Sequence, residues 1–197
     1  MAHSTQFDSK YYSRFYGKGG VHGKKRIADL ATSVHHMCKW WGLNVRSVLD
    51  VGAGPGFWAN WYRSEHPRVL VHSTDISEHA CAKYGHEQRD ISEWTPSRSY
   101  DLVICHGVLQ YPSDTAAKKA IENLGAATKH VMYLEIPTID DFRNVVDVST
   151  TDMDVHQRSG EWYRRELNKG FQQVGAGLWL SRQSNIPMYE LEQCASR

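Results

Sequence analysis

The chain has 197 residues, of which 41% are hydrophobic and 23% charged, which is enough apolar material for one globular domain with a full core. Its formal net charge of +1 excludes a strong overall field that would attract nucleic acid or an anionic membrane. There is no signal-peptide pattern, no apolar run long enough to span a membrane and no C-x-x-C pair among the four cysteines, so we expect reduced thiols in a cytoplasmic protein.

The first 21 residues are rich in aromatic side chains and end in glycines. Tyr11, Tyr12, Phe15 and Tyr16 stand within six residues, a pattern that predicts a helical turn followed by a glycine hinge. Four aromatic rings are costly to leave in water, so they should pack over something. Two roles remain open, a lid over a binding cleft and a staple that holds the first helix to the core. Apolar positions recurring at helical spacing then predict a helix over 24–41.

A strand followed by a glycine loop is the most informative segment. Strand 46–51 passes into Gly52, Gly54 and Gly56, and a helix over about 56–65 follows. Glycine permits the tight turn and leaves room for a ligand against the backbone, while the helix start presents unpaired N–H groups to it. A dinucleotide fingerprint, G-x-G-x-x-G, would need glycine where this chain has Phe57. The loop therefore indicates a nucleotide-type site that is not of the dinucleotide kind.

Strand and helix patterns alternate through the rest of the chain, which predicts a mostly parallel sheet covered by helices. The expected order is strand 68–74, helix 77–84, a short strand near 89–90, strand 100–105, helix 117–124 and strand 130–136. A polar stretch over 137–158 has no clear period, and a helix over 160–168 follows. Two last β segments, 171–180 and 186–193, are predicted to pair through a turn at 183–187.

The segment Asp50-Val-Gly-Ala-Gly-Pro-Gly resembles the cofactor loop of class I S-adenosylmethionine-dependent methyltransferases, and the order of elements over 22–194 resembles their fold. The resemblance implies a doubly wound α/β protein with a mostly parallel seven-stranded sheet, helices on both faces and a C-terminal antiparallel hairpin. We expect a single domain over 1–197, with 1–21 as lid or staple, 22–194 as the Rossmann-like core and 137–159 as a loop on the substrate side.

The resemblance also implies the residues that contact the cofactor, S-adenosylmethionine. Asp75, at the end of a strand, would accept hydrogen bonds from the ribose hydroxyls, although it could also cap the helix near Ser77. Asp90 would accept from the adenine amino group, although a simple turn aspartate is the alternative. The full expected set is Asp50, Gly52, Ala53, Gly54, Gly56, Asp75, Ile76, Asp90, Ile91, Cys105 and His106.

Residues for chemistry and substrate binding are harder to identify. A methyl sulfonium is already a strong electrophile, so a base is needed only when the acceptor carries a proton that must leave early. His106 is the first candidate for that base, with pocket shaping as the alternative, and His156 in the 137–159 loop is the second. We expect no metal site, because a solvated loop accounts better for the acidic stretch. The expected substrate or lid residues are Tyr11, Tyr12, Tyr16, Tyr111 and Tyr163.

The segment Cys105-His-Gly-Val follows the fourth strand and excludes two substrate classes. It is not the Asn/Asp-Pro-Pro-Tyr/Phe pattern of enzymes that methylate exocyclic amines of DNA adenine or glutamine, and it lacks the Pro-Cys pair used against cytosine C5. We therefore expect methyl transfer to an O or N atom of a small organic molecule, with nucleic acid and membranes not expected as partners. Action on RNA or a protein side chain, and a non-catalytic cofactor-binding module, remain alternatives.

Overall fold

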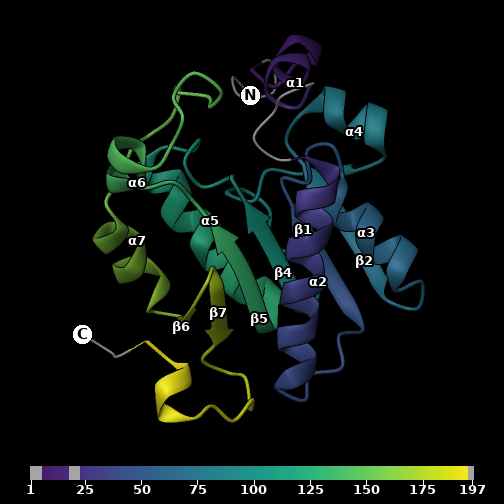
Figure 1. Ribbon diagram of the computed structural model, residues 1–197, viewed down its shortest axis with the longest axis vertical. Coiled ribbons are helices and arrows are strands. Elements are labelled where there is room, and N and C mark those ends of the chain that lie inside the picture. The colour runs from purple at the N-terminus through teal and green to yellow at the C-terminus, as the bar shows by residue number, and fades with distance from the viewer. Residues whose placement is uncertain (1–5, 18–22, 195–197) are drawn as a thin grey trace.

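The computed structural model describes residues 6–17 and 23–194, and its centre is a seven-stranded sheet of order β3-β2-β1-β4-β5-β7-β6 (Figure 1). Strands β1 to β5 pair with one another in parallel, and β7 is antiparallel to both β5 and β6. The predicted doubly wound α/β sheet is therefore confirmed. The strands are β1 (Ser47–Val51), β2 (Leu70–Asp75), β3 (Glu87–Gln88), β4 (Tyr100–His106), β5 (Thr128–Glu135), β6 (Phe171–Gly175) and β7 (Leu178–Ser181).

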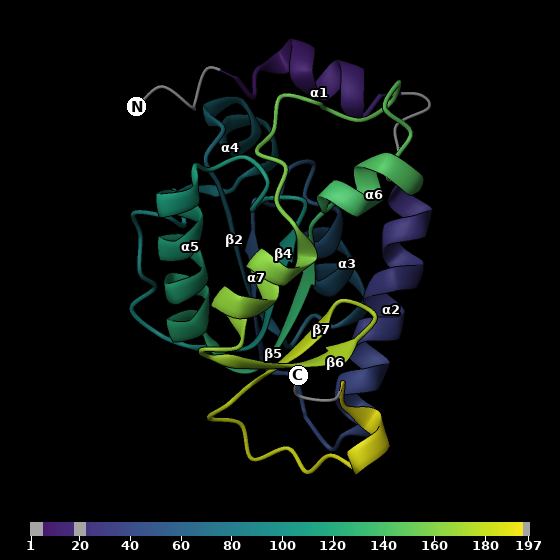
Figure 2. The same ribbon diagram turned by 90° about the vertical axis from the view of Figure 1, so that its left-hand side faces the viewer.

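Helices cover both faces of the sheet, and α5 and α2 lie on opposite sides of it (Figure 2). The helices are α1 (Ser9–Phe15), α2 (Lys24–Trp40), α3 (Phe57–Glu65), α4 (Glu78–Tyr84), α5 (Asp114–Ala127), α6 (Ile139–Asn144) and α7 (Gly160–Leu167). In the described ranges, no helix combines the length and the apolar character needed to cross a membrane. The four cysteines are all free thiols.

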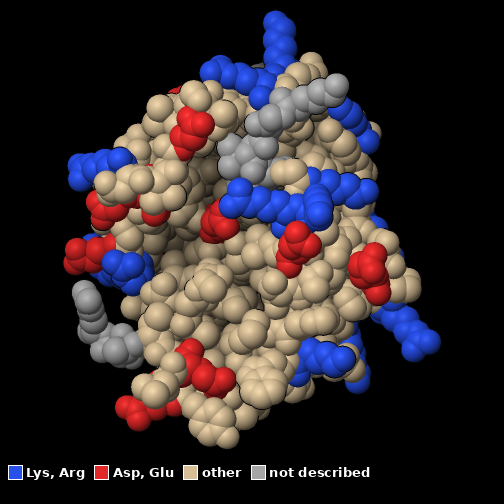
Figure 3. Space-filling model, viewed as in Figure 1, with Lys and Arg blue, Asp and Glu red and all other residues tan. Residues whose placement is uncertain are grey.

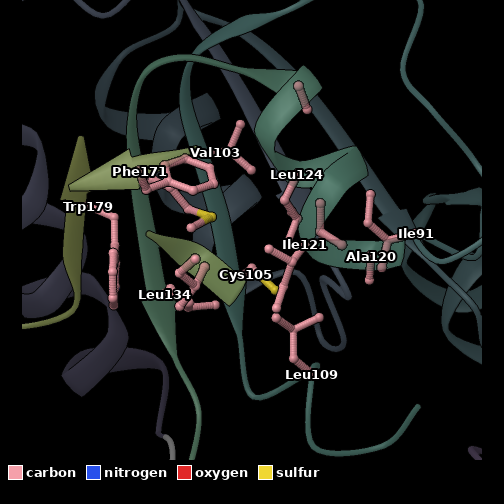
Figure 4. Close-up of a cluster of buried hydrophobic side chains, with 14 of the residues drawn as sticks. Ile91, Val103, Cys105, Leu109, Ala120, Ile121, Leu124, Leu134, Phe171 and Trp179 are labelled. Carbon is pink, nitrogen blue, oxygen red and sulfur yellow. The ribbon is translucent and has the colours of Figure 1, made fainter. Parts of the chain in front are cut away.

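The central strands are buried on both faces, as a parallel sheet between two helical layers requires. All five residues of β1 are buried, and successive strand residues alternate between two hydrophobic clusters. Leu49 and Val103 point to the side of α5 and α7, whereas Val48 and Leu102 point to the side of α2 and α3. Figure 4 shows the first cluster, in which the Cys105 sulfur lies among the apolar side chains of β4, β5 and α5.

The C-terminal hairpin is present, but its predicted position is wrong. The turn falls at Ala176-Gly177, between β6 and β7, and both turn residues have positive φ, +49° and +79°. Such a two-residue turn matches the twist of the flanking strands. The alternating pattern over 171–180 therefore belongs to two strands, and residues 186–193 form no strand but a short 3₁₀ helix, Glu190–Glu192.

The 137–159 stretch is partly helical. The sequence analysis expected only a loop there, because the stretch has no apolar period. Helix α6 begins with a capping box in which the Thr138 side chain and the Asp141 side chain each accept from the other's backbone N–H. Phe142 buries its ring beneath the helix. Residues 145–159, between α6 and α7, form neither helix nor strand and run beside α1 before the chain reaches α7 (Figure 2). A hydrogen bond from Gln6 Nε2 to Asp154 Oδ2, 3.3 Å, joins the two segments.

We predict that Asp101→Ala destabilises the fold by about 1.5–3 kcal/mol. The buried carboxylate accepts from the backbone N–H groups of Arg46 and Ser47 and from Ser47 Oγ at 2.8–3.1 Å, and so joins the start of β1 to β4. Its removal leaves buried donors without an acceptor. Urea unfolding monitored by circular dichroism measures the loss. Asp29→Ala, at an exposed position on α2, is the control and should change stability little; equal effects of the two substitutions would contradict the prediction.

Candidate active site

A cavity lies at the carboxyl ends of the parallel strands, and residues of α1 form part of its lining. This edge of an open parallel sheet is where ligands of such folds bind. On the face seen in Figure 3, acidic side chains gather over α6 and the segment after it, and basic side chains over α1 and the start of α2. The expected residues that line the cavity are Tyr11, Tyr12, Tyr16, Gly52, Gly54, Asp75, Ile76, Asp90, Ile91 and Tyr111.

The glycine loop adopts the conformation for which its glycines are needed. Gly52, Gly54 and Gly56 have φ of +65°, +54° and +74°, a region that other residues rarely adopt. A Cβ at position 52 would also lie 2.4 Å from the Cγ2 of Val108, across the cavity wall. The loop therefore brings bare backbone to the cavity, and α3 begins directly after Gly56. The Ala53 N–H is already bonded to Thr74 O, and neither Ala53 nor Gly56 lines the cavity.

Asp75 connects the glycine loop to α4. One carboxylate oxygen accepts from the N–H of Gly54 and the other from the N–H of Ser77, both at 2.8 Å. Ser77, not Asp75, is the N-cap of α4, so the capping alternative for Asp75 does not describe this helix. Burial raises the pKa of the Asp75 carboxyl, although the two backbone hydrogen bonds oppose the shift. Each carboxylate oxygen has a second lone pair, so the side chain can still accept from a ligand.

The end of β3 supplies the far wall of the cavity. Asp90 Oδ1 accepts from the N–H and the Oγ of Ser92, at 2.8 and 2.7 Å, which makes a tight turn after β3. Ile91 packs its side chain into the core, and its carbonyl accepts from Asn123 Nδ2 at 2.8 Å. Asp90 is thus a turn residue that also lines the cavity.

Arg158 holds the segment after β4 in place. Its buried guanidinium donates to the carbonyls of Leu109 and Pro112, at 2.8 and 2.5 Å, and pairs with Asp114 at 2.7 Å. Tyr163 also donates to Leu109 O and accepts from Arg158. Tyr163 therefore lies behind the cavity wall, and the cavity does not include it.

The N-terminal aromatic side chains both line the cavity and pack on the core. Tyr11 and Tyr111 share a hydrogen bond between their hydroxyls at 2.7 Å, and Ser77 Oγ donates to Phe7 O at 2.5 Å. The rings of Phe7 and Tyr11 meet edge to face with centroids 5.0 Å apart. Since Tyr12 also packs against Ala80 of α4, these rings contact both the cavity and a buried cluster.

His106 lies beside the cavity rather than in its lining. Its Nδ1 accepts from Trp58 Nε1 at 3.1 Å, and its Nε2 lies 3.2 Å from Glu135 Oε1. Asp50 is also outside the lining; it is 2% exposed and accepts from Ala59 N–H, and burial raises the pKa of its carboxyl to about 7. The Cys105 side chain is in the core, where burial raises the pKa of its thiol.

His156 is exposed, and its backbone N–H donates to Gln110 O at 2.8 Å, so the structure does not bring it to the cavity. Within 6–17 and 23–194, no cluster of three or more His, Cys, Asp or Glu side chains is arranged to hold a metal ion.

Several lining residues were not among the expected set. Gly107 and Val108 belong to the segment after β4, in which the sequence analysis expected Cys105, His106 and Tyr111. Phe7 had an available signal, because it stands four residues before Tyr11 and so continues the aromatic pattern. The additional lining residues are Phe7, Val51, Arg89, Ser92, Gly107, Val108, Pro112, Ser113 and Ala116.

A family model described as a methyltransferase domain matches residues 49–130 of the chain. This range contains the glycine loop, the ends of β2 and β3 and the segment after β4, and these parts contribute much of the cavity wall. A search of curated proteins gives no significant match.

Solved structures of methyltransferases share the fold over nearly the whole chain. Magnesium protoporphyrin IX methyltransferase from Synechocystis PCC 6803, solved with bound S-adenosylhomocysteine, superposes with a TM-score of 0.61 at 19% identity, over 90% of this chain and 97% of that one. An S-adenosylmethionine-dependent methyltransferase from Clostridium acetobutylicum ATCC 824 gives 0.63 at 14% identity, over 96% and 95%. An O-methyltransferase family protein from Burkholderia thailandensis gives 0.52 at 15% identity, over 91% and 64%.

The sheet order, the glycine loop and the cavity at the strand ends agree with these comparisons, and the fold predicted from the sequence is confirmed. The chain carries a methyltransferase domain and has the fold of class I S-adenosylmethionine-dependent methyltransferases.

Proposed function

We propose that this chain is an enzyme that transfers the methyl group of S-adenosylmethionine to an O or N atom of a small organic molecule. The observation that carries the proposal is the cavity at the carboxyl ends of β1, β2 and β4, enclosed by a glycine loop on one side and aromatic rings on the other. Such a space, covered by α1, suits a cofactor and a compact acceptor better than a macromolecular surface.

The residues present fit the cofactor. Gly52 and Gly54 line the cavity with bare backbone, so a ligand can lie against the loop. Asp75 retains acceptor capacity for ribose hydroxyls, and Ile91 and Ala116 offer apolar surface for a planar ring. These residues would hold the cofactor, which supplies an electrophilic methyl group when bound.

The protein's own contribution is to bind, orient and exclude water. We propose that α1 is a lid, because a Cβ built on Gly54 would lie 3.8 Å from the Tyr16 hydroxyl and 3.9 Å from the Tyr12 ring. Burial raises the pKa of Tyr11 and Tyr12 above the ordinary value, so these lid hydroxyls stay neutral at neutral pH. A lid of neutral aromatic side chains keeps water from the cavity without adding charge to it.

The proposal predicts that the purified protein binds S-adenosylhomocysteine and does not bind NAD. Phe57 begins α3 where a dinucleotide-binding loop would need a further glycine. Isothermal titration calorimetry measures both ligands. Incubation with methyl-labelled S-adenosylmethionine and a metabolite extract, followed by separation by size, then shows where the label goes. NAD binding in preference to S-adenosylhomocysteine would overturn the proposed function, and label on RNA or protein alone would overturn the small-molecule acceptor.

Asp75→Ala should weaken S-adenosylhomocysteine binding by about 1.5–3 kcal/mol, roughly a tenfold to 150-fold rise in Kd. The substitution removes the acceptor proposed for the ribose hydroxyls and also releases the N–H of Gly54. Calorimetry at fixed pH measures the change, with Asp29→Ala as the matched aspartate control at an exposed position. A folded Asp75→Ala protein with wild-type affinity would mean that the carboxylate only shapes the loop.

Asp50→Asn should stabilise the ligand-free protein at pH 8 by about 2–4 kcal/mol and much less at pH 5. Burial raises the pKa of Asp50 to about 7, so the native state binds a proton more tightly than the unfolded state does. The free energy of unfolding of the wild-type protein therefore falls as pH rises from about 4 towards 7, because ionised Asp50 is unfavourable in the native state. Asparagine cannot ionise, so the variant lacks this fall. Urea unfolding of both proteins at pH 5 and pH 8 measures the difference in stability. A stability difference that does not change with pH would contradict the prediction.

A further inference from the structure

Four side chains from β4, β5 and the start of α3 form a row near the carboxyl ends of β4 and β5. Trp58 Nε1 donates to His106 Nδ1 at 3.1 Å, His106 Nε2 lies 3.2 Å from Glu135 Oε1, and Tyr133 donates to Glu135 Oε2 at 2.6 Å. The cofactor residues proposed above do not need Trp58, Tyr133 or Glu135. The row therefore has no role yet in the proposed function.

The hydrogen bond from Trp58 determines which ring nitrogen of a neutral His106 carries the proton. An indole N–H can only donate, so the Nδ1 that faces Trp58 carries no proton. A neutral imidazole then has its proton on Nε2, which is the nitrogen that faces the Glu135 carboxylate. Both nitrogens are thus directed at groups of the protein, and this geometry does not favour His106 as the general base.

Glu135 is held at two points but is open to solvent. Its side chain is 47% exposed, whereas Tyr133 and Trp58 are 3% and 5% exposed. Glu135 is the register partner of His106, and its backbone carbonyl accepts from Gly107 N–H at 2.8 Å. Since Gly107 lines the cavity, this hydrogen bond places the Glu135 backbone beside the cavity wall at the ends of β4 and β5, while its carboxylate is turned toward His106 and Tyr133.

The segment after β5, on this side of the entrance, carries more acidic than basic side chains, although Arg143 lies 3.7 Å from Asp140 and Arg89 lines the cavity. The acidic residues of this segment include Asp140, Asp147, Asp152 and Asp154, and Figure 3 shows acidic side chains over α6 and the loop that follows. Asp152 is close enough to raise the pKa values of Tyr11 and Tyr111, although burial is the larger cause for both. A cation approaching from this side meets a favourable field.

We propose that Glu135 binds the methyl acceptor as an ammonium ion, so that the substrate class is an amine; this rests on the proposed function. A carboxylate pairs with a cation more strongly than with a neutral hydroxyl, and it removes a proton from an ammonium more readily than from an alcohol. His106 and Tyr133 are positioning residues that orient the carboxylate, and Trp58 orients His106.

The reaction balances without a further reactant. The bound ammonium gives one proton to the Glu135 carboxylate and becomes a neutral amine. Its lone pair forms the N–C bond to the methyl carbon while the C–S bond breaks, and that electron pair stays on sulfur. The sulfonium becomes a neutral thioether, the methylated nitrogen becomes the new ammonium, and the half-exposed Glu135 releases its proton to water.

The first test is ligand binding by NMR. ¹⁵N-labelled protein saturated with S-adenosylhomocysteine is titrated with n-butylammonium chloride and, separately, with n-butanol. The signals followed are the Trp58 indole N–H, assigned through Trp58→Phe, and the ring nitrogens of His106. We expect the ammonium to shift these signals and butanol to leave them nearly unchanged, and we expect the free protein to show His106 protonated on Nε2.

Glu135→Gln keeps the shape of the side chain and removes its charge, so it should abolish the response to n-butylammonium. Glu65→Gln, at an exposed position at the end of α3, is the matched control and should respond as wild type does. Tyr133→Phe should weaken the response by less than Glu135→Gln does, and Glu135→Asp should restore part of it. S-adenosylhomocysteine binding should be unchanged in all four variants, which also shows that they are folded.

For an amine substrate found by labelled transfer, Glu135→Gln should raise KM at least tenfold, and Glu135→Asp should recover part of the loss. Equal shifts with butanol and the ammonium, an unchanged response in Glu135→Gln, or a proton on His106 Nδ1 would overturn the inference. A wild-type protein that binds S-adenosylhomocysteine but not the ammonium would overturn the inference alone. A protein that does not bind S-adenosylhomocysteine would instead overturn the proposed function.

Discussion

The two hydrogen bonds accepted by Asp75 are the constraint on which the cofactor side of the site depends. They join the N–H of Gly54, in the turn after β1, to the N–H of Ser77, at the start of α4. Two loops that follow neighbouring strands are thereby fixed relative to each other by one buried carboxylate. Burial of that charge is unfavourable, and the backbone donors offset the cost. The same arrangement keeps acceptor lone pairs at the cavity wall, so the group that orders the loops is also available to a ligand.

Arg158 performs the corresponding task on the opposite wall. Its guanidinium reaches across from the segment before α7 and satisfies carbonyls of the loop after β4, which parallel-sheet hydrogen bonding leaves unpaired. That loop carries Val108 and Tyr111 into the cavity. Tyr111 in turn bonds the hydroxyl of Tyr11 on the lid. Through Arg158, the 137–159 stretch therefore holds the loop after β4 in place without lining the cavity itself.

The fold could be predicted from the sequence because its signals are local. The three glycines after an apolar strand specify their turn, and the alternating strands and helices specify the sheet order. The hairpin position was missed because Val174, Ala176, Leu178 and Leu180 keep an alternating pattern across a turn. The chain turns at Ala176 and Gly177, where φ is positive, although the alternation of side chains continues through these residues. Helix α6 was missed because its stability comes from a capping box and one buried ring, which leave little periodicity in six residues.

The sequence predicted a lining residue correctly only where its backbone, or its position near the end of a strand, brings it to the cavity. Gly52, Gly54, Asp75 and Asp90 line the cavity because they end strands, whatever their side chains contact. His106 also ends a strand, but its side chain takes the opposite face of the sheet, where Trp58 and Tyr133 lie. Strand alternation places Cys105 in one hydrophobic cluster and its neighbour beside the other, so position at the edge alone does not decide which side chains face a ligand.

The contacts of α1, the proposed lid, suit repeated opening. Its polar contacts include two hydroxyl hydrogen bonds, Tyr11 to Tyr111 and Ser77 to Phe7, each contributing about 0.5–1.5 kcal/mol net. The remaining contacts are rings packed edge to face, which can separate without leaving a buried charge. The glycine loop and the Arg158 contacts, in contrast, hold buried charged groups whose exposure or mispairing would cost far more. Displacement of α1 is therefore the least costly way for a ligand to reach the cavity, and the two walls can remain ordered while it moves.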